Sequence, residues 1–303
     1  MRVTVTGATG LIGTRLIKEL TARGDEVTVL SRDPEKARRT LGGAVQAVRW
    51  DPAAGPAPRE ALDGRDAVIH LAGEPVAQRW NAQVKERILS SREQGTRNLV
   101  AGIAAAEPRP RVLVSSSAVG YYGPHGDETL TESTAPGDDF LARVCVAWER
   151  EADAAEAHGL RVVKVRTGVV LDPDGGALKT MLPPFKLGAG GPVAGGKQYM
   201  PWIHVDAVVG IYDRALDDDG WTGAVNATAP APVTNKVFSK ALGRALNRPA
   251  FAPVPALAIR ALYGQMAEIV TKGQRAVPER TQALGYGFRH PDLDEALRSA
   301  LAT

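Results

Sequence analysis

Three glycines near the amino terminus constrain the fold of this chain more than any other feature. Gly7, Gly10 and Gly13 form a G-x-x-G-x-x-G pattern between the β-branched run RVTVT and the amphipathic segment LIGTRLIKEL. Glycines at such a junction permit a tight turn, and they let a pyrophosphate approach the open N–H groups at the start of a helix. The pattern predicts a dinucleotide-binding βαβ unit, with a glycine-rich turn that binds no ligand as the alternative. The residues expected to hold the pyrophosphate are Gly7, Thr9, Gly10, Leu11, Ile12 and Gly13.

The rest of the chain predicts an α/β protein. Short β-branched runs alternate with longer amphipathic segments as far as Leu171, a pattern typical of a parallel sheet with helices on both faces. After Leu171 the sequence becomes rich in Gly and Pro and then mostly helical. We therefore expect a Rossmann-type, doubly wound parallel sheet over residues 1–170 and a smaller carboxyl-terminal cap domain over residues 171–303. The cap would cover the carboxyl ends of the strands, where open α/β sheets bind ligands.

Composition and charge exclude several classes of partner. The chain has 303 residues, 44% of them hydrophobic, which is enough for a large core. Its 37 Lys and Arg residues barely outnumber 34 Asp and Glu residues, and no basic run suggests a nucleic-acid partner. No secretory signal or membrane-spanning run is visible, and the single cysteine, Cys145, excludes an internal disulfide. We expect a cytoplasmic monomer or homodimer with no membrane partner and no metal.

The end of the second predicted strand favours NADP(H) over NAD(H). An enzyme that prefers NAD(H) places Asp or Glu there for the ribose 2'-hydroxyl, whereas this chain has Ser31 and Arg32. The planar guanidinium of Arg suits a 2'-phosphate, with a solvated surface charge as the alternative. Asp33 could pair with Arg32 or bind a free 2'-hydroxyl. Trp50 and Asp51, at the end of the third strand, are candidates to flank the adenine, and core packing is an equal alternative for Trp50.

A series of motifs gives the chain a family resemblance. In order, TGATGLIG, VIHLAGEP, GTRNL, VLVSSSAVGYYG, VRTGVVL and GGKQYMPWIHVDA resemble an extended short-chain dehydrogenase/reductase. LAGEP, AVGYYG, LPPFKLG and WIHVD resemble more narrowly the NAD-dependent epimerase/dehydratase-like branch, formerly labelled cell-division inhibitor-like. The match covers nearly the whole chain, and residues 248–303 resemble the small terminal domain of that branch. The resemblance does not specify a substrate.

The resemblance implies further cofactor positions after the fourth strand. Leu71, Ala72 and Gly73 stand where the family backbone lines the ribose and phosphates of the cofactor, and Glu74 would lie close by. Arg92 stands where relatives commonly carry Asn near the cofactor. It could place a second cation by the phosphates, or it could be an exposed helix charge.

The catalytic pair of the wider family is missing. Relatives carry Tyr-x-x-x-Lys on a helix, where Lys reaches the cofactor ribose and lowers the pKa of Tyr from about 10. Matching the family's Glu to Glu149 places Phe140 at the Tyr position and Val144 at the Lys position, and an alignment shifted by one residue would make Arg143 the nearest cation. Phe140, Val144 and Trp148 share one helical stripe, so we expect this helix to pack against the core.

Other side chains are therefore the candidates for chemistry. Ser115 and Ser117 end the fifth strand, where the family's catalytic Ser binds the substrate oxygen, so Ser117 is the expected counterpart. Tyr121 and Tyr122 follow on a Gly-flanked turn and could supply the proton, or they could only shape the pocket. The candidates for substrate contacts are Lys197, Gln198 and His204, with a structural role as the alternative for His204.

Two functions remain open at this point. The first is an NADP(H)-dependent oxidoreductase or epimerase-like enzyme that acts on a small polar substrate, with nucleotide-linked compounds included. The second is a non-catalytic NADPH-binding sensor or partner-binding protein, linked to cell division as the older family label suggests. The second explains the absence of the Tyr and Lys more simply.

Overall fold

The fold is centred on a seven-stranded parallel sheet. The computed structural model describes residues 1–302. The strands are β1 (Arg2–Thr6), β2 (Glu26–Ser31), β3 (Val45–Arg49), β4 (Ala67–His70), β5 (Val112–Ala118), β7 (Arg161–Thr167) and β11 (Gly223–Ala227). They lie in the order β11-β7-β5-β4-β1-β2-β3, and every neighbouring pair is parallel. This arrangement confirms the Rossmann-type sheet predicted from the sequence.

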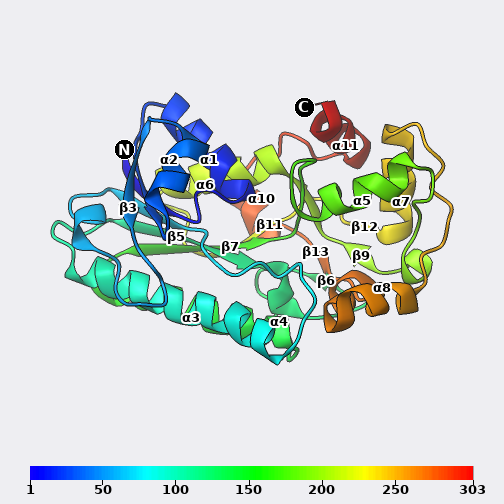
Figure 1. Cartoon of the computed structure of the whole chain (residues 1–303), viewed down its shortest axis with the longest axis horizontal. Coiled ribbons are helices and arrows are strands. Elements are labelled where there is room, and N and C mark those ends of the chain that lie inside the picture. The colour runs from blue at the N-terminus through cyan, green and yellow to red at the C-terminus, as the bar shows by residue number, and fades with distance from the viewer. Residues whose placement is uncertain (303) are drawn as a thin grey trace.

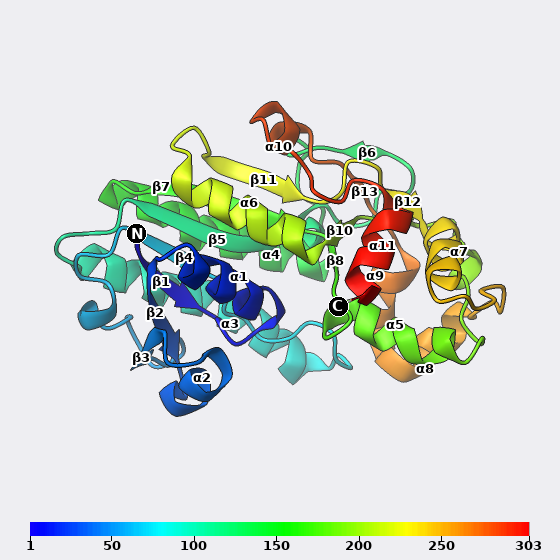
Figure 2. The ribbon, with the colours of Figure 1, turned by 90° about the horizontal axis from the view of Figure 1, so that it is seen from above.

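Helices cover both faces of the sheet. They are α1 (Leu11–Ala22), α2 (Pro34–Leu41), α3 (Ala82–Ala105), α4 (Phe140–Asp153) and α6 (Val205–Asp217). Helices α3 and α4 pack together beneath the sheet, while α1 and α6 pack together above it (Figures 1 and 2). Because both faces are covered, strands such as β4 are buried at every position and read as continuous apolar runs.

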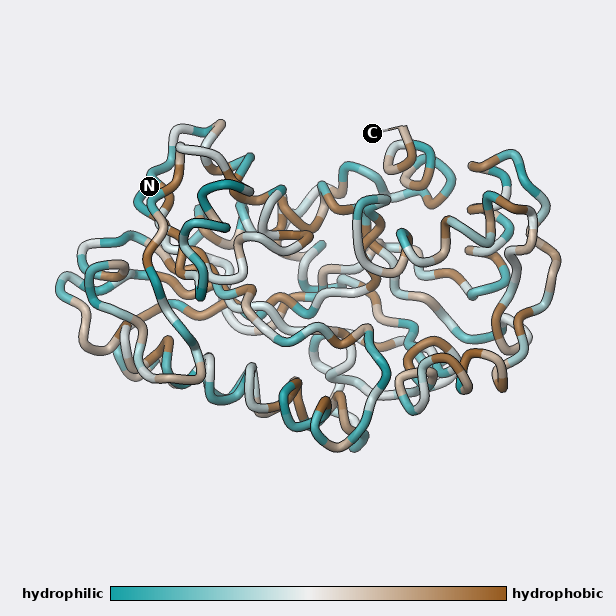
Figure 3. The backbone as a smooth tube through the Cα atoms, in the orientation of Figure 1, coloured by the Kyte–Doolittle hydropathy of each residue, from teal (hydrophilic) through white to brown (hydrophobic). Residues whose placement is uncertain are grey.

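Most of the remaining elements form the part to the right in Figure 1, while α10 (Glu279–Ala283) lies near the middle beside β11. The other helices are α5 (Gly176–Lys186), α7 (Asn235–Ala245), α8 (Ala256–Tyr263), α9 (Ala267–Thr271) and α11 (Leu293–Ala302). The short strands are β6 (Thr129–Leu130), β8 (Val169–Leu171), β9 (Tyr199–Met200), β10 (Trp202–His204), β12 (Val233–Thr234) and β13 (Arg275–Ala276). Figure 3 shows hydrophobic residues along the central strands and also in α8, which buries none of its side chains.

The segment after residue 170 also contributes to the sheet. Strand β11 forms its edge by pairing with β7, with Val225 beside Val165. Helix α6 packs on α1 across the same sheet. The sheet therefore takes one strand and one covering helix from the part of the chain that composition assigns to the cap. Within residues 1–302, no helix combines the length and the apolar character needed to cross a membrane.

Candidate functional site

The glycine turn after β1 is shaped to receive a ligand. Gly7 has a φ of +67°, and a Cβ added there would lie 2.6 Å from the carbonyl carbon of Leu71. A Cβ on Gly13, which is buried in the first turn of α1, would lie 2.5 Å from the Gly7 oxygen. Helix α1 has Gly10 at its N-cap, no side-chain cap and no acidic residue in its first turn. Its N–H groups and positive dipole end therefore suit a pyrophosphate.

The side chains around this turn leave the approach open. Thr9 and Gly10 are exposed, while Leu11 and Ile12 are half-buried at the start of α1. The turn holds its own shape through a hydrogen bond from the Gly10 N–H to the Gly7 oxygen, 3.0 Å long.

Arg32, at the carboxyl end of β2, is available to bind a ligand. Ser31 and Asp33 bond to each other, with 3.1 Å between the Asp33 nitrogen and the Ser31 Oγ. The Asp33 carboxylate caps α2 by accepting from the Lys36 N–H at 3.0 Å. Arg32 is exposed, and it forms no ion pair or hydrogen bond with any of the residues from 1 to 302. Of the two roles left open for Asp33, pairing with Arg32 is not observed.

Trp50 and Asp51 both have hydrogen-bond partners within the chain. Trp50 is only 5% exposed, packs in the core with residues of β3 and α3, and donates from Nε1 to the Gly55 oxygen at 3.0 Å. Its position favours core packing over a contact with adenine. Asp51 is exposed, and its carboxylate accepts from the Ala53 N–H at 3.1 Å.

A buried histidine anchors the end of β4. His70 Nδ1 lies 2.7 Å from Thr6 Oγ1, and Nε2 lies 3.0 Å from Thr96 Oγ1. Thr6 Oγ1 also accepts from the N–H groups of Leu71 and Ala72, both at 3.2 Å. These bonds hold the chain that leaves β4 against the glycine turn. Complete burial, with the nearby charge of Arg92, lowers the pKa of His70 from 6.5 to about 3.

Acid should destabilise the fold through His70. The folded protein keeps this imidazole neutral down to about pH 3, whereas the unfolded chain takes up a proton below pH 6.5. The free energy of unfolding should therefore fall by about 1.4 kcal/mol per pH unit between these two values because of this residue. Urea unfolding of the parent and of His70→Gln at pH 7, 6 and 5 measures the slope. Equal slopes in the two proteins would contradict this prediction.

Arg92 reaches from α3 toward the end of β4. Its Nη1 donates to the Glu74 oxygen at 2.9 Å and to the Ile88 oxygen at 3.2 Å. Its guanidinium carbon lies 4.9 Å from the centre of the Trp148 ring, and a Cβ added to Gly73 would lie 3.0 Å from that carbon. Arg92 is therefore not an exposed helix charge.

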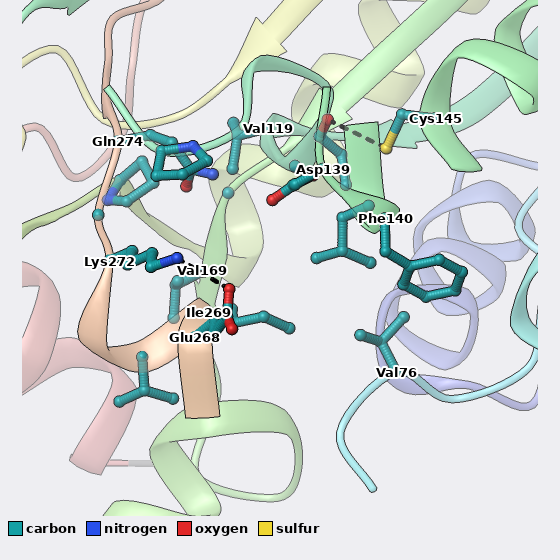
Figure 4. A pocket seen from close by; sticks show the side chains of 18 of the residues that line it. Val76, Val119, Asp139, Phe140, Cys145, Val169, Glu268, Ile269, Lys272 and Gln274 are labelled. Carbon is teal, nitrogen blue, oxygen red and sulfur yellow. Dashed lines mark hydrogen bonds and ion pairs between the residues drawn. The ribbon is translucent and has the colours of Figure 1, made fainter. Parts of the chain in front are cut away.

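A cavity of about 500 Å³ opens at the carboxyl ends of β5 and β7. Ala118 and Val119 line it after β5, and Thr167 and Gly168 line it after β7. Its far wall comes from α9, where Ile269 lies beside the ion pair between Glu268 and Lys272 (Figure 4). The cavity thus occupies the edge of the sheet at which parallel α/β folds bind ligands.

Helix α4 lines this cavity instead of packing wholly into the core. Val144 is only 2% exposed, but Phe140 is half-buried and points toward the cavity beside Val76 (Figure 4). The Phe140 ring packs edge-on against Trp80, with 5.2 Å between ring centres. The expectation that Phe140 lies in the core is corrected in part: it is half-buried and borders the cavity, but it also packs against the buried cluster of Val84, Ile88 and Val144.

Comparison with known proteins identifies the family. The sequence matches the NAD dependent epimerase/dehydratase family over residues 3–227 and a domain of unknown function, DUF1731, over residues 254–300. The chain belongs to the NAD dependent epimerase/dehydratase family.

Relatives in this epimerase family match the whole chain. The human epimerase family protein SDR39U1 is 39% identical over 307 residues and covers 100% of both chains. A chloroplastic homologue from Arabidopsis thaliana is 40% identical and covers 99% of this chain and 87% of its own. The crystal structure of human SDR39U1 with NADPH has a TM-score of 0.87 at 37% identity, with 100% of each chain covered. A nucleoside-diphosphate sugar epimerase from Corynebacterium glutamicum has a TM-score of 0.79 at 35% identity over 99% of this chain and 58% of its own.

The family's serine and glutamate belong to a buried polar network in this chain. Ser117 Oγ donates to Glu149 Oε1 at 2.6 Å, and Arg166 binds both Glu149 oxygens at 2.8 Å. The side chains of Arg166 and Glu149 are 5% and 7% exposed. Burial alone would lower the pKa of Arg166, but its bonds to Glu149 raise that pKa above the usual value. Ser115 is 1% exposed, and within residues 1–302 its hydroxyl donates only to the Ser116 oxygen.

The two tyrosines of the turn after β5 join the same network. Tyr122 is completely buried, and its hydroxyl donates to Asn226 Oδ1 at 2.7 Å and accepts from Arg166 Nη1 at 3.2 Å. Burial raises the pKa of Tyr122 to about 12. The centre of the Tyr121 ring lies 3.4 Å from the guanidinium carbon of Arg166. Neither ring lines the cavity, so their positions give no support to the expected role in proton transfer.

Two of the three residues predicted to contact substrate already have hydrogen-bond partners within the protein. Lys197 is exposed and does not line the cavity. Gln198 lines it, but its amide nitrogen donates to the Val193 and Val270 oxygens at 3.0 and 2.9 Å. His204 is 3% exposed, accepts at Nδ1 from the Asp206 N–H, and packs on His290 with 4.0 Å between ring centres.

The donor atoms of His204, Asp206 and His290 lie within 4.8 Å of one another. The Nδ1 atom of His204 already accepts from the start of α6, whereas its buried Nε2 has no partner among residues 1–302.

Several residues that line the cavity were not selected as site residues from the sequence. Trp80 and Lys85 border the Phe140 side, and Lys85 Nζ lies 5.0 Å from the centre of the Phe140 ring. Tyr199 and Met181 come from the segment after residue 170. The RW pair after LAGEP marks Trp80, and Lys85 reaches Phe140 across the contact between α3 and α4. Tyr199 and Met181 become neighbours of these residues only through the cap.

Proposed function

We propose that this epimerase-family chain binds NADP(H) and uses it for hydride transfer with a small substrate in the cavity. One arrangement carries the proposal: the glycine turn, the unpaired Arg32 and the cavity lie along the same edge of the sheet. The NADPH in the crystal structure of human SDR39U1 supports the cofactor assignment. The bound cofactor would supply or accept a hydride.

Different residues of the chain would bind the cofactor and enclose the substrate. The glycine turn and the first turn of α1 would hold the pyrophosphate, and Arg32 would hold the 2'-phosphate. Trp80, Phe140 and Val144 give the cavity an apolar wall that excludes water from the reacting carbon. We include small polar compounds and nucleotide-linked sugars among the substrates to be tested.

Arg32→Ala should remove most of the preference for NADPH over NADH. The guanidinium has no other partner among residues 1–302, so its charge is available to the 2'-phosphate. Loss of a charge-assisted hydrogen bond should weaken NADPH binding about ten- to a hundredfold and leave NADH binding unchanged. Calorimetric titration of both cofactors measures this, with Arg39→Ala, on the exposed surface of α2, as the control. Equal affinities of the parent protein for the two cofactors would contradict the role of Arg32.

The alternative function is a non-catalytic NADPH-binding sensor. The observation that favours it is the structural use of Ser117 and Tyr122, together with Phe140 and Val144 on α4. A screen of NADPH oxidation against carbonyl compounds and nucleotide sugars separates the two functions. Turnover supports the enzyme, binding without any turnover supports the sensor, and absence of NADPH binding contradicts both.

A further inference from the structure

We propose that Arg92 binds the hydroxyls of the ribose on the nicotinamide side of NADP(H), a task for which α4 has Val144 where relatives carry Lys. This proposal rests on the proposed cofactor. It assigns a cation from α3 to a site at which the facing helix presents Val144 and Trp148. Arg143 of α4 also borders the cavity, but its Nη1 donates to the Asp138 oxygen.

The position of Arg92 follows from the path between the glycine turn and the cavity. The turn touches the chain that leaves β4, because a Cβ on Gly7 would lie 2.6 Å from Leu71. Two residues further along that chain, Gly73 faces the Arg92 guanidinium. Arg92 then lines the cavity together with Val144. A dinucleotide with its pyrophosphate on the turn and its nicotinamide in the cavity must pass its second ribose over this stretch.

The surroundings of Arg92 leave donors for a ligand. Nη1 is engaged by the backbone oxygens of Glu74 and Ile88, and the Trp148 ring covers one face. Within residues 1–302, Nε and Nη2 have no acceptor, and no carboxylate lies within ion-pair distance. Arg92 is half-buried, and these two groups are not among the buried polar atoms that lack a partner, so they are accessible to a ligand. Hydroxyl oxygens would be suitable acceptors for them.

The phosphates have other partners in the proposed site. The first turn of α1 and Arg32 supply donors for the pyrophosphate and the 2'-phosphate. Arg92 lies beyond Gly73 from that turn, beside Val144. The ribose is therefore the part of the cofactor that this guanidinium meets.

A series of cofactor fragments tests the assignment. The four probes are 2',5'-ADP, 2'-phospho-ADP, 2'-phospho-ADP-ribose and NADPH, and only the last two contain the second ribose. Arg92→Gln should weaken those two about ten- to a hundredfold, as expected for hydrogen bonds from a charged donor, and should leave the first two unchanged. Arg92→Lys should recover part of the loss. Arg97→Gln, at an exposed position of the same helix, is the matched control.

Each other outcome has a definite meaning. A loss that is already present with 2'-phospho-ADP would overturn the proposal, because Arg92 would then bind phosphate. Equal affinities of Arg92→Gln and the parent for all four probes would also overturn it. If the parent binds none of them, the proposed function itself fails. If Arg92→Gln does not fold, Gly73→Ala replaces it. Its Cβ would lie 3.0 Å from the guanidinium carbon and shift that group slightly without removing the charge, so it should cause a smaller loss confined to the two probes with the second ribose.

Discussion

Glu149→Ala is expected to lower the free energy of unfolding by about 3–5 kcal/mol, because it leaves a buried guanidinium without its carboxylate. Arg166 binds both Glu149 oxygens, and the two side chains are almost completely enclosed. The variant keeps the bonds from Arg166 to Tyr122 and to the Glu132 oxygen, but neither neutralises its charge. The loss of an acceptor for Ser117 adds to the cost. Urea unfolding at pH 7 gives the difference.

An exposed ion pair provides the control. Arg244 and Asp294 are 59% and 46% exposed, so Asp294→Ala should cost at most about 1 kcal/mol. The double variant Glu149→Met with Arg166→Met should recover much of the loss, since no unpaired charge remains buried. A loss below about 1 kcal/mol in Glu149→Ala would show that the pair contributes no more than a surface pair does.

Gly7→Ala should destabilise the fold by about 2–5 kcal/mol and weaken NADPH binding at least tenfold, through backbone strain and a clash. Gly7 has a φ of +67°, and its new Cβ would lie 2.6 and 2.7 Å from backbone atoms of Leu71 and Ala72. Either the turn or the chain after β4 must move, and both belong to the proposed cofactor path. Thermal melts and NADPH titration measure the two effects.

Gly24→Ala separates strain from crowding. Gly24 has a φ of +85°, but a Cβ there would meet nothing within 4 Å. This variant should cost about 1–2 kcal/mol and bind NADPH as the parent does. If both variants lose the same stability and both keep NADPH binding, the close contact of the turn with Leu71 has no functional importance.

Local sequence predicted the elements near the glycine turn. The strand RVTVT, the helix from Leu11 and the stop at Gly24 are all present, because each depends on neighbours within one or two turns. The sheet and its class follow from alternating segments in the same way.

The parts that sequence reasoning did not predict depend on distant partners. The spacing of apolar residues predicted that Phe140 and Val144 share one face of a helix. It could not show whether that face meets the core or a cavity, because the opposite wall of the cavity comes from α9, far away in the sequence. Tyr122 bonds to Asn226, which lies 104 positions later in the sequence. No local pattern reveals such a contact, so a tyrosine predicted at the ligand edge is found inside the protein.

The carboxyl-terminal segment is joined to the sheet by more than surface contact. The Glu132 carboxylate accepts from the N–H groups of Asn226, Arg280 and Thr281, and the Asn226 side chain donates to the Val277 oxygen. A chain cut after residue 253 would lose most of these partners and leave polar groups around the edge strand unsatisfied. Because the segment matched by the epimerase family and the DUF1731 segment share these hydrogen bonds, we expect the two segments to unfold together.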